Sequence, residues 1–409
     1  MEELVTLKQI VEAAEKLRQV ISPSPIKYST TFSRMTGSEV YLKAENLQKT
    51  GSFKIRGAYN KIYSLTSQEK KRGIIAVSAG NHAQGAALAA SLLGVKSLVV
   101  MPKTAPLSKI TATEDYGARV ILTGENYIEV QEAALQIAEK ENLVLIHPFN
   151  DPLVIAGQGT IGLEILKERQ DLDAVIVPVG GGGLISGIST VLKKLRPEVQ
   201  VIGVQAASCP AVFNSFLEGK ILSVKRRPTM ADGIAVEKPG SITFEILKKY
   251  VDTMAAVEEE DIAQTILMLL ERTKLMVEGA GAVGLTALLS RKINLVNKKV
   301  VVVLSGGNID VTLLSRIINR GLARSGRLIK LNVLLPDKAG VLSELLGIVS
   351  DREANVLDIR HERLSLELPI DFVEVELLLE TRDREHSEEI IRALVHKKYK
   401  LKPTLSNLC

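Results

Sequence analysis

Short apolar runs alternate with amphipathic stretches along most of the chain. The expected strands lie at residues 40–43, 74–77, 97–101, 118–122, 143–147, 173–179, 200–205 and 300–304. The expected helices include residues 4–20, 82–93, 127–140, 158–168 and 184–195. Strands that alternate with helices in this way are typical of an α/β fold with mostly parallel open sheets and helices on both faces.

The pattern changes after about residue 326. Strand-like segments at 328–335, 355–363, 372–379 and 399–401 are interrupted by helix-like segments after Gly340 and around 390–395. The resulting order, βαββαβ, is that of a ferredoxin-like unit. We therefore expect two domains, a larger one at residues 1–325 and a smaller one at residues 326–409.

The composition is ordinary for a globular protein, with 46% hydrophobic and 24% charged residues and a net charge of +5 over 409 residues. No basic run is interleaved with aromatic residues, so nucleic acid is not an expected partner. Cys209 and Cys409 are the only cysteines, too few for a disulfide framework or a thiolate metal site. No apolar segment resembles a membrane span or a signal peptide, so we expect a cytoplasmic protein without a membrane partner.

Lys54 stands between Phe53 and Ile55, directly before a helix-like run. An amine held in an apolar pocket has a lowered pKa and can serve as a nucleophile and a base. Such an amine also forms a Schiff base with an aldehyde cofactor. The alternative is a lysine at a helix start whose ammonium group lies in water, and three other stretches bear on this choice.

These three stretches are glycine-containing loops that follow apolar runs. Ser78–His82 opens a helix, where backbone N–H groups and the Asn81 amide suit a carboxylate or a phenolate. Gly180–Gly183 lets the backbone close around a phosphate, and the dipole of the next helix favours the negative charge. Ser305–Asn308 places a hydroxyl at the carboxyl end of a strand, where open α/β sheets bind ligands.

In this order, Lys54, the Asn81 loop, the four glycines and Ser305–Asn308 resemble the fold-type II (tryptophan synthase β-like) enzymes that use pyridoxal phosphate (PLP). Within that family, residues 5–320 look like a threonine ammonia-lyase, also called threonine dehydratase. The resemblance implies PLP as the cofactor. It also implies a smaller mobile lobe at about residues 50–165, nested in the catalytic domain.

The same resemblance implies roles for individual residues. Lys54 would be the Schiff-base lysine, with Phe53 beside the cofactor ring. Asn81 would hydrogen-bond the phenolic oxygen of the cofactor, and Ser305 would face the pyridine nitrogen. The expected phosphate cradle consists of Gly180, Gly181, Gly182, Gly183 and Leu184.

The implied reaction is an α,β-elimination from L-threonine, giving 2-oxobutanoate and ammonia, or from L-serine, giving pyruvate. The expected catalytic residues are Lys54, Ser78 and Ala79, with Lys54 removing the Cα proton. The expected substrate-binding residues are Ser78, Ala79, Gly80, Asn81 and His82. The alternative for His82 is a histidine that caps or packs against the helix. The neutral hydroxyl of Ser305 would favour loss of the β substituent over transamination.

Other functions fit parts of the same pattern. A serine racemase of this fold carries a serine as the acid on the second face of the cofactor, and this chain has Ala79 there. A non-catalytic amino-acid sensor would not need an intact Lys54 or Ser305. A β-replacement synthase such as cysteine synthase fits Ala79–Gly80 and the C-terminal unit poorly. The sequence leaves open whether threonine or serine is preferred, and whether the duty is isoleucine biosynthesis or threonine catabolism.

The sequence also leaves a metal ion open. No cluster of His, Glu and Asp has the spacing of a catalytic metal site. Asp232, within Pro228–Gly233, lies in a stretch near which some relatives bind a structural cation. An aspartate in a turn is an equal interpretation of the same residue.

The turn at 337–342 resembles the ACT regulatory domains that bind amino acids. A glycine there lets the backbone approach a ligand, and the N–H groups of the next helix suit a carboxylate. The expected effector-binding residues are Asp337, Gly340, Leu342 and Asn355, with isoleucine or valine as the effector. ACT-like units usually pair across subunits, so we expect a homo-oligomer, a dimer or a tetramer. The alternative is a unit that serves assembly alone.

Overall fold

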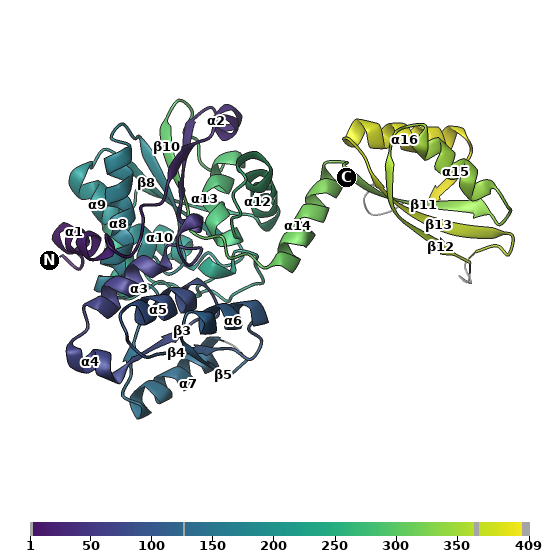
Figure 1. The fold of residues 1–409 in the computed structure, drawn as a ribbon. Coiled ribbons are helices and arrows are strands. Elements are labelled where there is room, and N and C mark those ends of the chain that lie inside the picture. Colours follow the sequence, from purple (N-terminus) through teal and green to yellow (C-terminus); the bar gives the residue numbers. More distant parts are fainter. Residues whose placement is uncertain (1–2, 126, 364–367, 403–409) are drawn as a thin grey trace. The chain divides into compact units, whose positions relative to one another are not determined.

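The computed structural model describes residues 3–125, 127–363 and 368–402 (Figure 1). The chain forms two compact units, Met1–Ile309 and Asp310–Cys409. The first unit contains two sheets and the second contains one. No helix in these described ranges is long and apolar enough to cross a membrane.

The larger sheet of the first unit has six strands. In spatial order they are β1 (Ile26–Tyr28), β2 (Glu39–Ala44), β10 (Lys299–Leu304), β7 (Ala174–Pro178), β8 (Gln200–Ala206) and β9 (Thr253–Val257). Only β1 is antiparallel to its neighbour, and all other adjacent pairs are parallel. Figure 1 shows helices on both sides of this sheet: α8 (Pro152–Glu168) and α9 (Gly183–Leu195) on one, α12 (Glu259–Thr273) and α13 (Gly279–Leu289) on the other.

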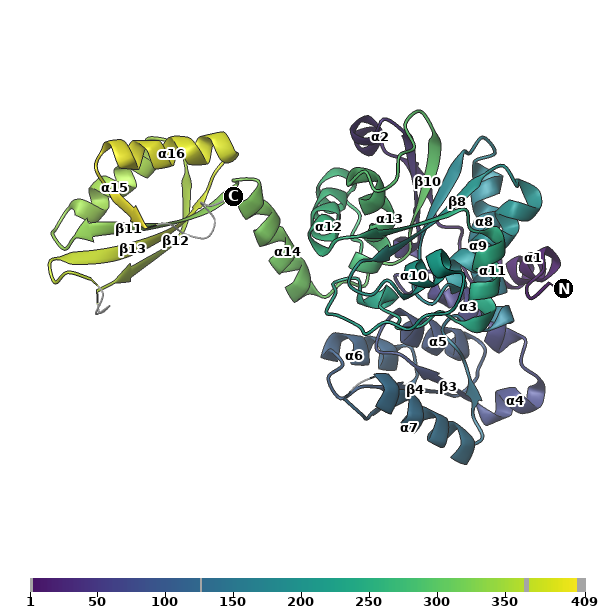
Figure 2. The same cartoon turned by 180° about the vertical axis from the view of Figure 1, so that it is seen from behind.

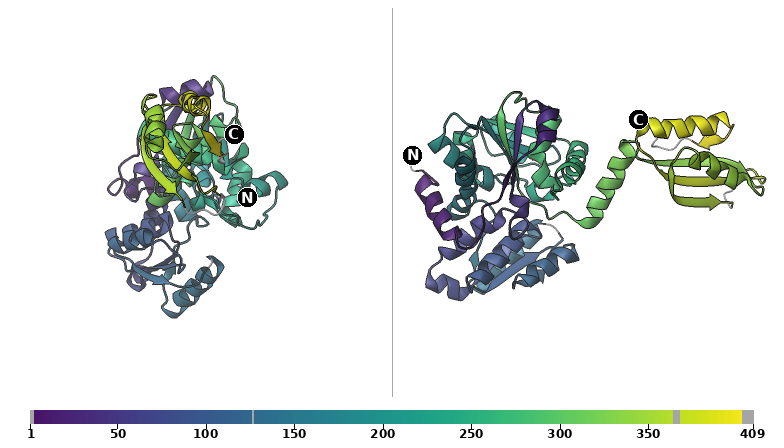
Figure 3. Two further views of the ribbon diagram at one scale, coloured as in Figure 1. Left: turned by 90° about the vertical axis from the view of Figure 1, so that its right-hand side faces the viewer. Right: turned by 45° about the horizontal axis from the view of Figure 1, so that its top comes forward.

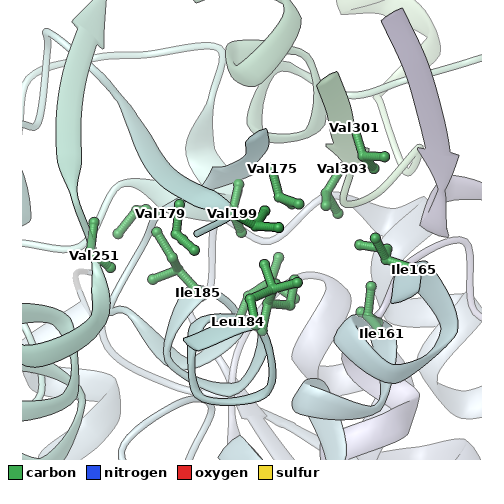
Figure 4. Close-up of a cluster of buried hydrophobic side chains, with 14 of the residues drawn as sticks. Ile161, Ile165, Val175, Val179, Leu184, Ile185, Val199, Val251, Val301 and Val303 are labelled. Atoms are coloured by element: carbon green, nitrogen blue, oxygen red, sulfur yellow. The ribbon is translucent and has the colours of Figure 1, made fainter. Parts of the chain in front are cut away.

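Alternate side chains of the central strands point to these two helix layers. Val175 of β7 and Val301 of β10 lie in a buried cluster with Ile165 of α8 (Figure 4). Val302 points the other way, because a Cβ built on Gly284 of α13 would lie 3.1 Å from its Cγ1. Both faces of the strands are therefore buried, which explains their continuous apolar runs.

A smaller lobe lies in sequence between β2 and β7. Its four parallel strands, in spatial order, are β5 (Arg119–Leu122), β4 (Ser97–Met101), β3 (Ile74–Val77) and β6 (Val144–Leu145). Helices α3 (Lys54–Tyr63) and α5 (Asn81–Leu92) cover one face, where Ile74 and Ala86 share a cluster. Helix α7 (Tyr127–Lys140) covers the other, where Ile75 and Val130 share another (Figure 2).

The remaining elements of the first unit connect these layers. They are α1 (Leu7–Leu17), α2 (Thr30–Thr36), α4 (Ser67–Arg72), α6 (Leu107–Asp115), α10 (Ala211–Glu218), α11 (Ser241–Tyr250) and the 3₁₀ turns η1 (Glu45–Leu47) and η2 (Asp232–Ile234).

The second unit has the order βαββαβ after helix α14 (Val311–Arg324). Its elements are β11 (Leu328–Pro336), α15 (Val341–Ser350), β12 (Asn355–Glu362), β13 (Phe372–Glu380), α16 (Arg384–His396) and β14 (Lys400–Lys402). The strands are antiparallel in the spatial order β12, β13, β11, β14. Both helices pack on one face, where Leu345 and Ile390 meet Val333 and Val375 (Figure 3). The predicted ferredoxin-like order is confirmed.

The structure also departs from the sequence pattern. Helix α8 begins at Pro152 instead of residue 158, because the Asp151 side chain caps its N-terminus and proline suits the first helical position. Helix α1 covers Leu7–Leu17, a shorter span than the predicted 4–20. Strands β1 and β9 were not predicted. The compact units divide after Ile309, which groups α14 with the second unit, whereas the sequence pattern placed the division after residue 325.

Candidate active site

The lysine segment and the Ser305 loop are adjacent in the first unit. Ser52 forms an isolated antiparallel bridge with Gly306. The Phe53 N–H donates to the carbonyl oxygen of Ser305 over 3.2 Å. Two stretches far apart in the sequence are therefore joined by backbone hydrogen bonds beside Lys54.

Lys54 is the first residue of α3, and its side chain is half-buried. Its Nζ donates to the carbonyl oxygen of Pro148 over 3.0 Å and lies 5.1 Å from the centroid of the Phe53 ring. Burial of the amine lowers the pKa of Lys54 to about 8, although the charge of Glu278 acts in the opposite direction. An amine with this pKa is partly neutral near physiological pH and can accept a proton.

Asn81, at the start of α5, is held on both sides of its amide group. Its Nδ2 donates to Oε1 of Glu278 over 2.6 Å, and its Oδ1 accepts from Nδ2 of Asn308 over 2.7 Å. Asn308 also donates to the carbonyl oxygen of Thr50 over 2.7 Å. The second N–H of the Asn81 amide has no acceptor among the described residues, which suits the phenolate that the resemblance implies there.

Glu278 is the site residue that the sequence analysis missed. It precedes the first residue of α13 and is buried. Burial and the charge of Asp232 raise the pKa of Glu278 to about 7, although its hydrogen bond with Asn81 acts against this. A single carboxylate inside the apolar and small-residue stretch Val277–Gly281 was the available signal.

The loop before α5 offers backbone donors. The Ser78 Oγ accepts from the N–H of Gly80 over 3.1 Å, and no side chain caps the first turn of α5. Uncapped N–H groups at a helix N-terminus bind carboxylates. Ala79 packs against a cluster that includes Ala83 and Val99, so it presents only a methyl group.

His82 does not fit the substrate-binding role that the sequence suggested. Its ring is buried, and Nε2 lies 2.8 Å from the carbonyl oxygen of Ile146. Burial and the nearby Lys54 charge lower the pKa of His82 to about 3, so the ring is neutral. The side chain is a packing histidine that ties α5 to the segment after β6, and only its backbone N–H belongs to the loop.

The four glycines form a backbone cradle between β7 and α9. Gly182 has a φ of +98°, and a Cβ on Gly181 would lie 2.4 Å from ring atoms of Phe149. A Cβ on Gly183 would lie 2.9 Å from the Phe149 Cβ. No side chain caps α9, so the N–H groups of Gly183 and Leu184 are donors for an anion.

These features fit the phosphate and ring of PLP. Gly180–Gly183 offer backbone without side chains for a phosphate, and Lys54 has the amine that an aldehyde cofactor would need. Ser305 is buried, and the hydroxyl makes one hydrogen bond among the described residues, to the carbonyl oxygen of Ala280, which is long at 3.5 Å. Ser52 Oγ is buried and has no hydrogen-bond partner among the described residues. Both hydroxyls are therefore available to a polar ligand atom.

Asp232 shows no metal-binding arrangement in the described ranges. Its Oδ2 lies 3.3 Å from Nζ of Lys109, which belongs to α6 of the smaller lobe. No group of three or more His, Cys, Asp or Glu residues there could hold a metal ion.

The second unit contains a pocket of about 280 Å³ beside the Asp337–Gly340 turn. Asp337, Gly340 and Leu342 line it, and Asp337 pairs with Arg363 over 3.3 Å. Asn355 does not line it, because it lies at the opposite end of β12, where its Nδ2 donates to Glu380. Asn355 is therefore not part of this pocket within one chain, and its contact with an effector stays a prediction.

The chain is similar to proteins of known function. The family model described as pyridoxal-phosphate dependent enzyme matches residues 17–306. The L-threonine ammonia-lyase of Thermotoga maritima is 55% identical over 399 residues, which cover 98% of this chain and 99% of that protein. The catabolic L-threonine dehydratase TdcB of Escherichia coli K12 is 46% identical over 315 residues, 76% of this chain and 96% of that protein.

A solved structure, that of maize serine racemase, is also similar. Its TM-score is 0.74 at 32% identity, and the match covers 78% of this chain and 98% of the maize chain. The two-lobed fold is thus common to enzymes that catalyse different reactions, and the Thermotoga maritima relative, which matches almost the whole chain, is an ammonia-lyase. The chain belongs to the PLP-dependent enzymes of fold type II and, within them, to the L-threonine ammonia-lyases.

Proposed function

We propose that this chain converts L-threonine to 2-oxobutanoate and ammonia, and L-serine to pyruvate and ammonia. The observation that carries the proposal is the buried Lys54 amine, which lies in one site with the Asn81 amide and the Gly180–Gly183 cradle. The names of the relatives at 55% and 46% identity support threonine as the substrate.

The chain's own residues supply binding and proton transfer. Gly180–Gly183 and the start of α9 would hold the cofactor phosphate, and Asn81 would hold the phenolic oxygen. Bound PLP supplies an acceptor for the electron pair of the Cα–H bond. The uncapped first turn of α5 holds the substrate carboxylate, which fixes the Cα–H bond relative to Lys54.

Lys54 then takes the Cα proton as a general base, since a pKa of about 8 leaves part of the amine neutral near pH 7. The protonated amine is the donor that the site offers to the departing β-hydroxyl, which leaves as water. Net loss of water gives an enamine, and its hydrolysis consumes one water and gives the 2-oxo acid and ammonia. Ser305 would hold the pyridine nitrogen of bound PLP with a neutral hydroxyl and no negative charge, which would favour elimination over transamination.

Racemisation of serine is the second candidate, and Ala79 argues against it. Ala79 has only a methyl group, which packs against the cluster with Ala83 and Val99. Residue 79 therefore offers no side-chain acid that could return a proton to the second face of Cα. A sensor without catalysis is disfavoured because the lysine and all three loops meet in one site.

The test is an assay of 2-oxo acid formed from threonine and from serine by the PLP-loaded parent and by Lys54→Ala. We expect the parent to form 2-oxobutanoate and the variant to lose at least roughly 1,000-fold in kcat, because base and cofactor anchor are both removed. Borohydride treatment followed by peptide mapping should place a pyridoxyl label on Lys54. A label on another lysine, or turnover by the variant at the parent's rate, would contradict the assignment.

We also propose that the second unit is an ACT-like domain that regulates the first. The ferredoxin-like order, the Gly340 turn with φ of +89° and the adjacent pocket support an amino-acid ligand. Isoleucine or valine fits the apolar lining by Leu335, Leu342 and Val373. Such units usually pair across subunits, so the proposal includes a homo-oligomer.

A further inference from the structure

Arg56, two residues after the active-site lysine, carries a fully buried guanidinium group. Its Nε and Nη2 donate to the carboxylate of Glu45 over 2.8 and 2.7 Å. Its Nη1 and Nη2 donate to the carboxylate of Glu164 over 2.6 and 3.0 Å. The guanidinium group therefore bridges two carboxylates and uses all three of its nitrogens.

The two carboxylates come from the segments that connect the two lobes. Glu45 opens η1, directly after β2 of the larger sheet. Glu164 lies in α8, through which the chain returns to β7 of the same sheet. Arg56 thus joins the outgoing segment, the first turn of α3 and the returning segment at one point.

Lys43 balances the charge of this cluster. Its Nζ is buried and donates to Oε2 of Glu164 and to the carbonyl oxygen of Ser24, both over 2.6 Å. The hydroxyl of Ser24 donates to Glu45. The more exposed carboxylate of Glu168 lies 3.7 Å from the same Nζ. The two buried cations are therefore compensated by the carboxylates around them, as buried charges require.

Close backbone contacts enclose the same turn of α3. A Cβ on Gly157 of α8 would lie 2.6 Å from the carbonyl oxygen of Arg56, and one on Gly57 would lie 2.6 Å from that of Val154. On the other side, a Cβ on Gly85 of α5 would lie 3.0 Å from the carbonyl carbon of Lys54. The backbone of the lysine turn has little room to rotate once the guanidinium group is fixed.

Stability alone is a weak reason for such a cluster. Replacing a buried ion pair or triad by well-packed apolar residues is often neutral or stabilising, because desolvation of the charges offsets their attraction. A planar guanidinium group between two carboxylates does fix the orientation of the segment that carries it, which an apolar side chain does not. The geometric role therefore accounts for the cluster better than a contribution to stability does.

We propose that Arg56 is a positioning residue for Lys54, because its fork between Glu45 and Glu164 fixes the first turn of α3 and with it the ε-amino group. The inference rests on the proposed role of Lys54. The inference explains what holds the Lys54 amine in position between the two lobes.

The test is Arg56→Lys, which keeps the charge and loses the planar fork. In the PLP-loaded enzyme we expect kcat for threonine to fall roughly 10- to 100-fold, the loss typical of a misplaced catalytic group, with a much smaller change in KM. In the apo-protein, trace acetylation with mass spectrometry measures the pH dependence of Lys54 reactivity. Its midpoint should rise from about 8 toward the ordinary value of 10.5, because a loosened turn exposes the amine to water.

Arg169→Lys is the matched control. Arg169 directly follows α8, stacks on the Tyr41 ring at 4.1 Å and pairs with Asp171 over 3.0 Å. We expect this variant to leave the acetylation midpoint of Lys54 and the kcat unchanged. If Arg56→Lys does not fold, Glu164→Gln removes one carboxylate of the fork and should shift the midpoint in the same direction, by less.

Two outcomes overturn the proposal. In one, Arg56→Lys folds and melts at a lower temperature than the parent, but it keeps the parent's acetylation midpoint and kcat. In the other, Arg169→Lys shifts the midpoint as far as Arg56→Lys does. Because acetylation needs neither cofactor nor substrate, a parent without threonine activity whose Lys54 midpoint still responds to Arg56→Lys would contradict the proposed function and leave the positioning role standing.

Discussion

Glu278 occupies the interior of the active site, between the amide of Asn81 and the backbone of Gly306. A Cβ on Gly306 would lie 2.3 Å from Oε1 of Glu278, so glycine is needed for the carboxyl group to fit. The carboxyl group lies away from solvent and near the charge of Asp232, and its pKa is raised to about 7 from 4.5. A proton on Glu278 is therefore retained in the folded protein at a pH where the unfolded chain has released it.

This raised pKa predicts how Glu278→Gln changes the pH dependence of stability. Between pH 4.5 and about 7 the native state of the parent holds more protons than the unfolded state, so its stability falls as pH rises. The stability of the variant does not fall in this way, because glutamine does not titrate, and its side-chain oxygen can still accept a hydrogen bond from Asn81. Its stability relative to the parent should increase by up to about 3 kcal/mol from pH 4.5 to pH 8. Urea unfolding of both apo-proteins at the two pH values checks this. If the difference in free energy of unfolding between them is the same at both pH values, the pKa of Glu278 is not raised.

Ala79→Ser tests whether the missing hydroxyl decides the fate of serine. A hydroxyl at this position could return a proton to the second face of Cα, so the variant should form more D-serine than the parent. Chiral analysis of the serine recovered from each reaction measures this. If D-serine does not increase, the geometry of the loop and not the absent hydroxyl sets the outcome.

Sequence reasoning reached site residues that stand in short, chemically distinctive stretches. Lys54, Asn81 and Gly180–Gly183 are of this kind, because their neighbours indicate a helix start or a phosphate cradle. Glu278 is a single carboxylate whose partner Asn81 is 197 residues away, so only the fold brings the two together. The direction of the His82 ring likewise depends on Ile146, which no local pattern indicates.

Among the connections between helices and strands, the glycine loop between β7 and α9 has the clearest requirement for particular residues. It needs backbone without side chains because Phe149 fills the space on its other side. Strands with long apolar runs, such as β3 and β10, were predictable for a related reason, since burial on both faces needs such runs. Strand β1 has only three residues after Ser22–Pro25, and β9 contains two alanines, so neither carried a strong strand pattern.

Gly181→Ala is predicted to weaken cofactor binding. The added methyl group would lie 2.4 Å from the Phe149 ring, so the loop or the ring must move and the N–H groups lose their alignment. We expect the Kd of PLP to rise at least about tenfold, equivalent to about 1.4 kcal/mol. Spectroscopic titration of the apo-protein measures it. Gly347→Ala in α15 is the control, because its Cβ meets nothing within 4 Å, and an equal loss there would point to a general effect on folding.

At the scale of the whole molecule, the chain combines a unit that carries the chemistry with a unit that carries a separate pocket. The sequence predicted both because each has its own periodicity, whereas the smaller lobe between β2 and β7 was expected only from the family resemblance. The related Escherichia coli enzyme aligns over 315 residues, almost its entire length. The match covers 76% of this chain and 96% of that enzyme, so a family member can be about a quarter shorter than this chain.

Removal of the chain after Gly326 is therefore expected to leave threonine turnover intact and to abolish any response to isoleucine or valine. Initial rates with and without each amino acid, together with calorimetry on the full-length protein, measure both effects. Effector and substrate must change each other's affinity by the same factor. If the shortened and full-length proteins respond equally, or if the full-length protein binds neither amino acid, the second unit does not regulate.

Strand β10 has a consequence for how the protein is made. It is the last strand of the six-stranded sheet in sequence, yet it lies between β2 and β7 and pairs with both. A nascent chain that has not yet emerged as far as Leu304 leaves the inner edges of β2 and β7 unpaired, and exposed edges of this kind promote aggregation. Ser305 and Gly306 also arrive beside Lys54 only at that stage. We therefore expect stable cofactor binding late in biosynthesis, and we expect a chaperone that shields the incomplete sheet to raise the yield of active enzyme.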